Sequence, residues 1–143
     1  MTSSSAALSY FLSMSNPNAA AYIVQGISDA TEGTGYRWAY EHPVLRYFVP
    51  PMDRPKFVME FALPERIFRI TGPVTLTFSL NGKRFDRTTY SHPGQLQYEH
   101  EVPPELFLWD DINLVSIEAD KVWTSQADGR KLAFVVSRVG FVE

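Results

Sequence analysis

The sequence contains no cysteine, which excludes disulfide bonds, thiolate catalysis and cysteine-ligated zinc or iron–sulfur centres. Histidine is also scarce, and His42, His92 and His100 lie far apart, with no further ligand at the two-to-four-residue spacing of a metal site. No apolar run approaches the roughly 20 residues that a membrane-spanning helix needs. These absences predict no metal, no cofactor and no membrane span.

Positive charge does not dominate either. The 143 residues carry 13 Lys and Arg against 16 Asp and Glu, a net charge of −3, so no broad positive field is available for nucleic acid. Carboxylates are ligands that calcium uses, and the C-terminal third of the chain offers Asp110, Asp111, Asp120 and Asp128. They lack the ordered spacing of a calcium loop, so we expect solvated loop carboxylates.

No catalytic pattern stands out. The sequence has no nucleophile elbow and no Ser-His-Asp context. Glu99 and Glu101 share one face of a predicted strand, but nothing in the sequence indicates a cleft that would hold one of them protonated, as glycoside hydrolysis requires. We therefore predict that the protein is not an enzyme.

The clearest structural signal is a β-hairpin. Val74 to Leu80 alternates apolar and hydroxyl side chains and runs into Asn81-Gly82, a pair that tolerates the positive φ of a type I′ turn. In the simplest register of the return strand, Leu76 would face Arg87, which a buried position does not tolerate unpaired. The pattern therefore predicts a bulge or an edge position after Phe85.

Short strands separated by turn residues continue along the chain, with no convincing helix. Nine strands are expected, at 22–27, 36–40, 44–49, 56–63, 74–80, 83–90, 95–102, 113–119 and 132–139. A single helical turn is expected after Pro103-Pro104. This arrangement predicts an all-β protein, an antiparallel two-sheet β-sandwich.

Residues 1–21 differ from the remainder, because they are rich in Ser and Ala and uncharged. We predict an N-terminal arm or tail at 1–21 and a β-sandwich domain at 22–143. A loosely packed terminus is one interpretation and a docking arm is the other, since several residues are more apolar than a solvated tail requires: Leu8, Tyr10, Phe11, Leu12 and Met14. No Lys or Arg precedes this segment, so it is a poor signal peptide, and a cytoplasmic or peripheral membrane-complex location is favoured.

Many positions between about 24 and 142 resemble a galactose-binding-like jelly roll. They include Asn81-Gly82-Lys83, Tyr90, Pro93-Gly94, Tyr98, Val102-Pro103-Pro104, Leu108 and Asn113 to Glu118, with Gly26, Glu32, Arg37-Trp38 and Val44-Leu45-Arg46 before them and Asp120, Trp123, Asp128-Gly129, Leu132 and Gly140-Phe141 after them. The resemblance is to the small sandwich domain appended to bacterial glycosyltransferases and other carbohydrate-processing enzymes. It implies a jelly-roll fold and a role in binding or scaffolding.

Aromatic residues at strand ends or in loops are the remaining candidates for recognition, because a ring can stack on a sugar or anchor an interface. They are Trp38, Tyr40, Tyr90, Trp109 and Trp123. Trp38 and Trp123 have a second interpretation, in which they close the ends of the core. Trp109, between Leu108 and Asp110, is the stronger interface candidate.

Two functions follow from these features. The favoured prediction is a non-enzymatic accessory subunit that docks on a larger protein complex, soluble or membrane-bound, through the arm and one sandwich face. The alternative is a carbohydrate-binding module that uses the loop aromatics and polar neighbours such as Asn81, Arg84 and Asp86.

Overall fold

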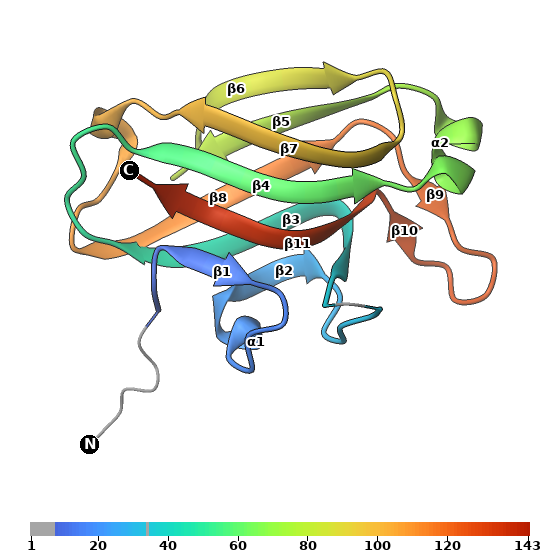
Figure 1. The fold of residues 1–143 in the computed structure, drawn as a ribbon, viewed down its shortest axis with the longest axis horizontal. Helices are drawn as coiled ribbons and strands as arrows, with labels where there is room; N and C mark the ends of the chain where they lie inside the picture. Colours follow the sequence, from blue (N-terminus) through green and yellow to red (C-terminus); the bar gives the residue numbers. More distant parts are fainter. Residues whose placement is uncertain (1–7, 34) are drawn as a thin grey trace.

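The computed structural model describes residues 8–33 and 35–143, which form a two-layered antiparallel β-sandwich (Figure 1). The all-β jelly-roll prediction is confirmed. The strands are β1 (Phe11–Ser13), β2 (Ile23–Ile27), β3 (Arg37–Val49), β4 (Lys56–Leu63), β5 (Val74–Leu80), β6 (Lys83–Tyr90), β7 (Gly94–Glu101), β8 (Asp111–Ala119), β9 (Trp123–Thr124), β10 (Lys131–Leu132) and β11 (Phe134–Val142). Two short α-helices, α1 (Ala19–Tyr22) and α2 (Glu65–Thr71), and the 3₁₀ helix η2 (Pro104–Leu106) complete the described part.

The long strand β3 belongs to both layers. Its first residues, Arg37 to Ala39, pair with β11, whereas Val44 to Val49 pair with β8. The hydrogen-bonded order is therefore β6-β5-β8-β3-β11-β4-β7, with β1 added beside β11 and β2 beside β3. The sequence pattern predicts two strands here, separated at Pro43. One strand forms because Pro43, which has no N–H to donate, lies where β3 changes partners.

Aromatic rings fill the space between the layers. Phe57 on β4 is fully buried, and its ring centroid lies 5.5 to 6.1 Å from four other rings, which belong to Phe78, Phe85, Tyr98 and Phe141. These partners come from β5, β6, β7 and β11, so this one side chain joins both sheets. Edge-to-face and tilted contacts at this separation are favourable beyond the burial of apolar area.

The edge strands β6 and β7, which end the hydrogen-bonded order, are joined by side chains. The Tyr98 hydroxyl on β7 donates to an Asp86 carboxylate oxygen on β6 at 2.6 Å, and His100 Nε2 lies 3.7 Å from the same oxygen. Burial, followed by this hydrogen bond, raises the pKa of Tyr98. The two edge strands are thereby linked by a polar bridge between their side chains.

The predicted hairpin is confirmed in detail. Asn81 and Gly82 have φ of 51° and 86°, both positive as a type I′ turn requires. The register then shifts at Phe85, because Phe78 pairs with Asp86 while Ser79 pairs with Arg84. This bulge places Arg87 opposite Thr77 on the outer face and removes it from the core.

The Asn81 side chain does more than permit the turn. Its amide donates to the Leu106 carbonyl and to Asn113 Oδ1, both at 2.9 Å, and its own oxygen accepts from Leu114 N–H. Asn113 is fully buried, and it also bonds both polar backbone groups of Leu108. Two asparagine side chains therefore fasten the hairpin turn to the loop before β8.

The segment 8–21, expected as a separate arm or tail, is part of the sandwich. β1 pairs with β11 between Phe11–Ser13 and Arg138–Gly140, and Leu12 and Met14 are completely buried. The chain must run close to Gly140, where an added Cβ would lie 2.6 Å from the Phe11 Cα. This short strand has no pattern of its own in the sequence, since its burial depends on β11. Residues 1–7 lie outside the described part of the chain.

Helix α2 was not expected from the sequence. It follows Pro64, buries Ile67 and is followed by Gly72, whose positive φ of 74° favours a residue without a side chain. The helical turn expected after Pro103 is confirmed as η2. Helix α2 lies at one end of the sandwich beside β9 and β10, and η2 lies at the other end (Figure 1).

Candidate functional site

A groove of about 330 Å³ lies at the α2 end of the sandwich. Its walls are mostly apolar and aromatic, with Arg66 as the charged member. The lining residues are Tyr36, Trp38, Pro64, Arg66, Ile67, Ile70, Trp123, Leu132 and Val135. This volume and composition are typical of a ligand pocket, which is largely apolar with few polar groups.

Trp38 enters the groove because it points to the outer face of the sheet. Its neighbours along β3, Arg37 and Ala39, are buried, while Trp38 is half-buried and pairs with Val135. Arg37 fixes this orientation, since its guanidinium donates to the carbonyl groups of Met14 and Ser28 at 3.2 and 3.0 Å. Alternation along the strand then leaves the indole ring on the solvent side.

Tyr36 is held by a tight turn before β3. Backbone hydrogen bonds join Glu32 and Tyr36 in both directions, and the Tyr36 ring lies against Gly33. A Cβ at Gly33 would approach this ring to 2.5 Å, so the absence of a side chain makes room for it. The half-buried tyrosine therefore stands beside Trp38 with a defined backbone position.

Trp123 comes to the groove on the small hairpin of β9 and β10, where it pairs with Leu132. The hairpin loop is held by Arg130, whose Nε lies 2.7 Å from Asp128 Oδ2. The hydrogen bond with Tyr40, the largest cause, and the Asp128 charge raise the pKa of Arg130. Tyr40, one of the predicted binding residues, is not among the residues that line the groove.

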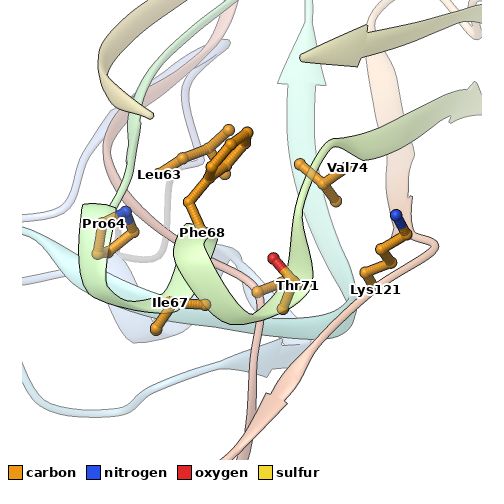
Figure 2. A pocket seen from close by; sticks show the side chains of 8 residues that line it. Leu63, Pro64, Ile67, Phe68, Thr71, Val74 and Lys121 are labelled. Carbon is orange, nitrogen blue, oxygen red and sulfur yellow. The ribbon is translucent and has the colours of Figure 1, made fainter. Parts of the chain in front are cut away.

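Helix α2 closes the groove from the remaining side. It presents Arg66 and Ile70, and Ile70 is 67% exposed, which is unusual for a large apolar side chain. On its other side the helix covers a small cavity between Leu63, Phe68 and Val74 (Figure 2). That cavity measures about 10 Å³, room for no more than one water molecule, so it is excluded as a ligand site.

A second hollow of about 400 Å³ adjoins the groove on the outer face of β4, β7 and β11. It shares Tyr36, Pro64 and Val135 with the groove. Its polar members are Gln95 and Ser137 together with Tyr36, and its lining carries no ionised group. The two hollows are therefore one continuous depression whose walls change from aromatic to neutral polar.

A third hollow, of about 250 Å³, lies on the outer face of the other sheet. It is lined by charged and hydroxyl side chains, among them Thr77, Arg84, Arg87 and Glu118. No aromatic ring contributes to it. Without a ring, this hollow offers no surface on which a sugar could stack. Arg84, predicted as a polar neighbour of a glycan, lines this third hollow and does not line the aromatic groove.

The remaining predicted aromatics do not line the groove. Trp109 is half-buried and stacks on Phe107 with a centroid distance of 4.5 Å, in the segment after η2 at the opposite end of the sandwich. Tyr90 is half-buried and packs edge-on against Phe61 at 5.2 Å. Of the predicted aromatics, the structure brings Trp38 and Trp123 into the groove, where they are joined by Tyr36.

The predicted residues of the N-terminal segment lie elsewhere. Leu8 is half-buried against the core, Leu12 is fully buried, and Tyr10 is 43% exposed. Phe11 is half-buried, with the Arg138 guanidinium 5.1 Å from its ring centroid. None of these residues lines the groove or the hollow beside it.

Tyr90 leads to a prediction about alkaline stability. Burial, with a smaller effect of the Asp86 charge, raises the pKa of Tyr90 to about 12 from an ordinary value of 10.0. Because the folded-state pKa is the higher one, the stabilisation is complete below pH 10 and is lost as the pH rises through 12. The free energy of unfolding, measured by urea denaturation, is expected to fall over this interval, less steeply in Tyr90→Phe. Equal slopes for the two proteins would contradict the assignment.

Within residues 8–33 and 35–143, no three His, Asp or Glu side chains gather where they could hold a metal ion. Over the same residues, no helix has the length and apolar character needed to cross a membrane.

No protein-family model matches the sequence, and no curated protein sequence matches it. Solved structures do match the fold. A family 35 carbohydrate-binding module, Xyl-CBM35, solved with a disaccharide containing glucuronic acid, superposes with a TM-score of 0.54 at 13% identity, covering 94% of each chain.

Two further modules have the same architecture. A family 35 carbohydrate-binding module from Clostridium thermocellum has a TM-score of 0.54 at 12% identity, covering 93% of this chain and 98% of the other. The C-terminal family 6 module of a laminarinase from Zobellia galactanivorans has a TM-score of 0.51 at 6% identity, covering 93% of this chain and 99% of the other. At these identities the likeness establishes the fold: the chain has the galactose-binding-like jelly roll.

These findings overturn the favoured functional prediction. The accessory-subunit hypothesis relied on an apolar docking arm, but the described part of that segment is built into the sandwich, with Leu12 inaccessible to any partner. The structural neighbours are carbohydrate-binding modules rather than docking subunits. The prediction was wrong because apolar residues that complete this protein's own core were read as contacts for another protein.

Proposed function

We propose that this protein is a carbohydrate-binding module and that the groove of Trp38, Trp123 and Tyr36 holds the sugar. The observation that carries the proposal is the meeting of two half-buried tryptophans from distant parts of the chain in one open groove. Aromatic rings with one accessible face suit the apolar C–H face of a pyranose ring. The three carbohydrate-binding modules that share the fold support this choice.

The polar members of the groove suit the same ligand. Arg66 can donate several hydrogen bonds to sugar hydroxyl groups from the rim of the groove. The apolar wall of Ile70, Leu132 and Val135 excludes water from the stacked face. The role that we propose for these residues is to bind the sugar, not to react with it.

The test compares three tryptophan variants. Trp38→Ala and Trp123→Ala are expected to weaken glycan binding by on the order of 1–3 kcal/mol, the loss of a stacking contact. This corresponds to about a 5- to 150-fold higher Kd in titration calorimetry. Glycans for the titration come from an array screen of the unmodified protein.

Trp109→Ala is the matched control, because it removes the same side chain from the opposite end of the sandwich. Its affinity is expected to equal that of the unmodified protein, with folding of each variant checked by thermal unfolding. Unchanged affinity in both groove variants would place the site elsewhere. A protein that binds no glycan on the array would overturn the proposed function.

A further inference from the structure

The second hollow continues the groove in a defined direction. The strand registers align Trp38 with Val135, Val135 with Ala62, and Ala62 with Gln95. This row runs across β3, β11, β4 and β7, perpendicular to the strands, on the outer face of the sheet. Its length is three interstrand spacings, roughly 14 Å, which is more than one pyranose ring occupies.

The chemistry changes along this row. At the Trp38 end the walls are aromatic and aliphatic, whereas at the Gln95 end the amide of Gln95 and the hydroxyl of Ser137 replace them. Ser137 donates to the Glu60 carbonyl at 3.1 Å, so its oxygen remains able to accept a hydrogen bond. Gln95 is exposed on β7 and offers both a donor and an acceptor.

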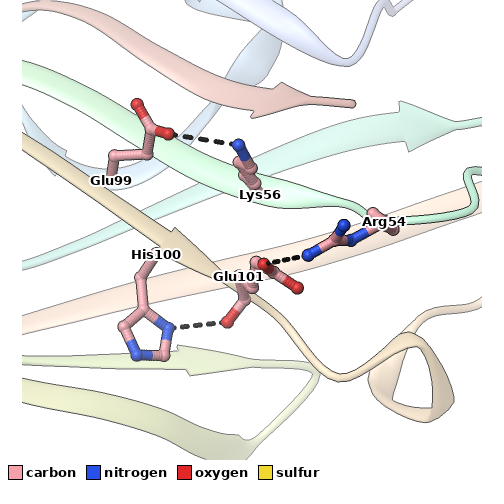
Figure 3. A network of polar contacts seen from close by, with 5 residues as sticks. All are labelled: Arg54, Lys56, Glu99, His100 and Glu101. Carbon is pink, nitrogen blue, oxygen red and sulfur yellow. Dashed lines mark hydrogen bonds and ion pairs between the residues drawn. The ribbon is translucent and has the colours of Figure 1, made fainter.

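Charged side chains farther along this face are paired with one another. Arg138 lies 3.5 Å from Glu60, and Lys56 lies 3.4 Å from Glu99 on the neighbouring strand. Figure 3 shows the second pair together with the Arg54–Glu101 pair at 2.9 Å. The second hollow therefore borders a face whose charges are balanced, and its own lining is neutral.

We infer that the ligand is an oligosaccharide that lies across strands β11, β4 and β7, with one sugar unit stacked at Trp38 and Trp123 and a neutral, hydroxyl-bearing unit at Gln95 and Ser137. This inference rests on the proposed function and adds the size of the ligand and the charge of its second unit. A monosaccharide fills only the aromatic groove. A longer chain gains hydrogen bonds in the second hollow.

The experiment measures affinity as a function of chain length. Linear neutral gluco- and xylo-oligosaccharides of one to five units, linked β-1,4, are titrated calorimetrically into the unmodified protein, Gln95→Ala and Gln97→Ala. In the unmodified protein the affinity is expected to rise with length until the row is filled and then to stay constant. Gln95→Ala is expected to bind the longer chains with about 3- to 10-fold lower affinity, which corresponds to the loss of one or two hydrogen bonds. Its affinity for the monosaccharide is expected to be unchanged.

Gln97→Ala is the matched control, since Gln97 lies on the same face of β7, one pair beyond the second hollow. It is expected to bind every chain length as the unmodified protein does. Binding that does not depend on chain length, or equal affinities of Gln95→Ala and Gln97→Ala at every length, would overturn this inference but leave the proposed function standing. Absence of binding at every length, to these probes and on the array, would overturn the proposed function and the inference with it.

Discussion

Replacement of Phe57 by alanine is expected to lower the free energy of unfolding by about 3–5 kcal/mol, the range for a fully buried phenylalanine. The ring is inaccessible to solvent and contacts rings from four other strands. Its loss leaves a cavity between the two sheets that the surrounding large rings cannot easily fill. Urea denaturation followed by tryptophan fluorescence measures the change.

Phe48→Ala supplies the control for this prediction. Phe48 lies on β3 and is 38% exposed, so its truncation removes less buried area and leaves no closed cavity. A loss of about 1–2 kcal/mol is expected from this smaller change in burial. Equal losses for the two variants would show that the ring cluster is not the centre of the core.

Leu12→Ala is expected to cost about 2–5 kcal/mol, as for other fully buried leucines. Leu12 pairs with Val139 in the sheet and has no accessible surface, although it lies in the segment that sequence reasoning separates from the domain. The same denaturation measurement applies. The result decides whether residues 8–21 contribute to stability.

Leu114→Ala is the comparison, because Leu114 is 45% exposed on the outer face of β8. Its truncation is expected to change the free energy of unfolding by about 1 kcal/mol or less, as is usual for surface positions. If Leu12→Ala were equally mild, the N-terminal segment would be a loosely attached tail and the observed β1–β11 pairing would contribute little.

Local patterns predicted the parts of the fold that depend on local chemistry. The Asn81-Gly82 turn, the bulge at Phe85 and the helical turn at η2 each follow from the residues that form them. Helix α2 was not predicted, because its seven residues are too few to give a clear periodic pattern. Gly72, which follows it, is the one residue that could have indicated the end of a helix. Strand β1 was not predicted, because only its distant partner buries it.

The candidate site was only partly predictable for a related reason. The sequence identifies Trp38 as an aromatic ring near a strand end and allows Trp123 either a core or a recognition role, but it gives no signal for Tyr36 or Gln95. These residues meet only when α2, the β9–β10 hairpin and the pairing of β3 with β11 are in place. These segments are far apart in the chain, so no regular spacing in the sequence indicates that their side chains meet.

The position of β11 has a consequence for the time course of folding. This strand is the last in chain order, yet it lies inside the sheet, with β4 on one side and β3 and β1 on the other. Sheets dominated by such non-local pairing fold in roughly milliseconds to seconds, because long loops must close first. Val135 on β11 forms the wall shared by the groove and the second hollow. The proposed ligand site is therefore complete only after β11 has inserted between β4 and β3.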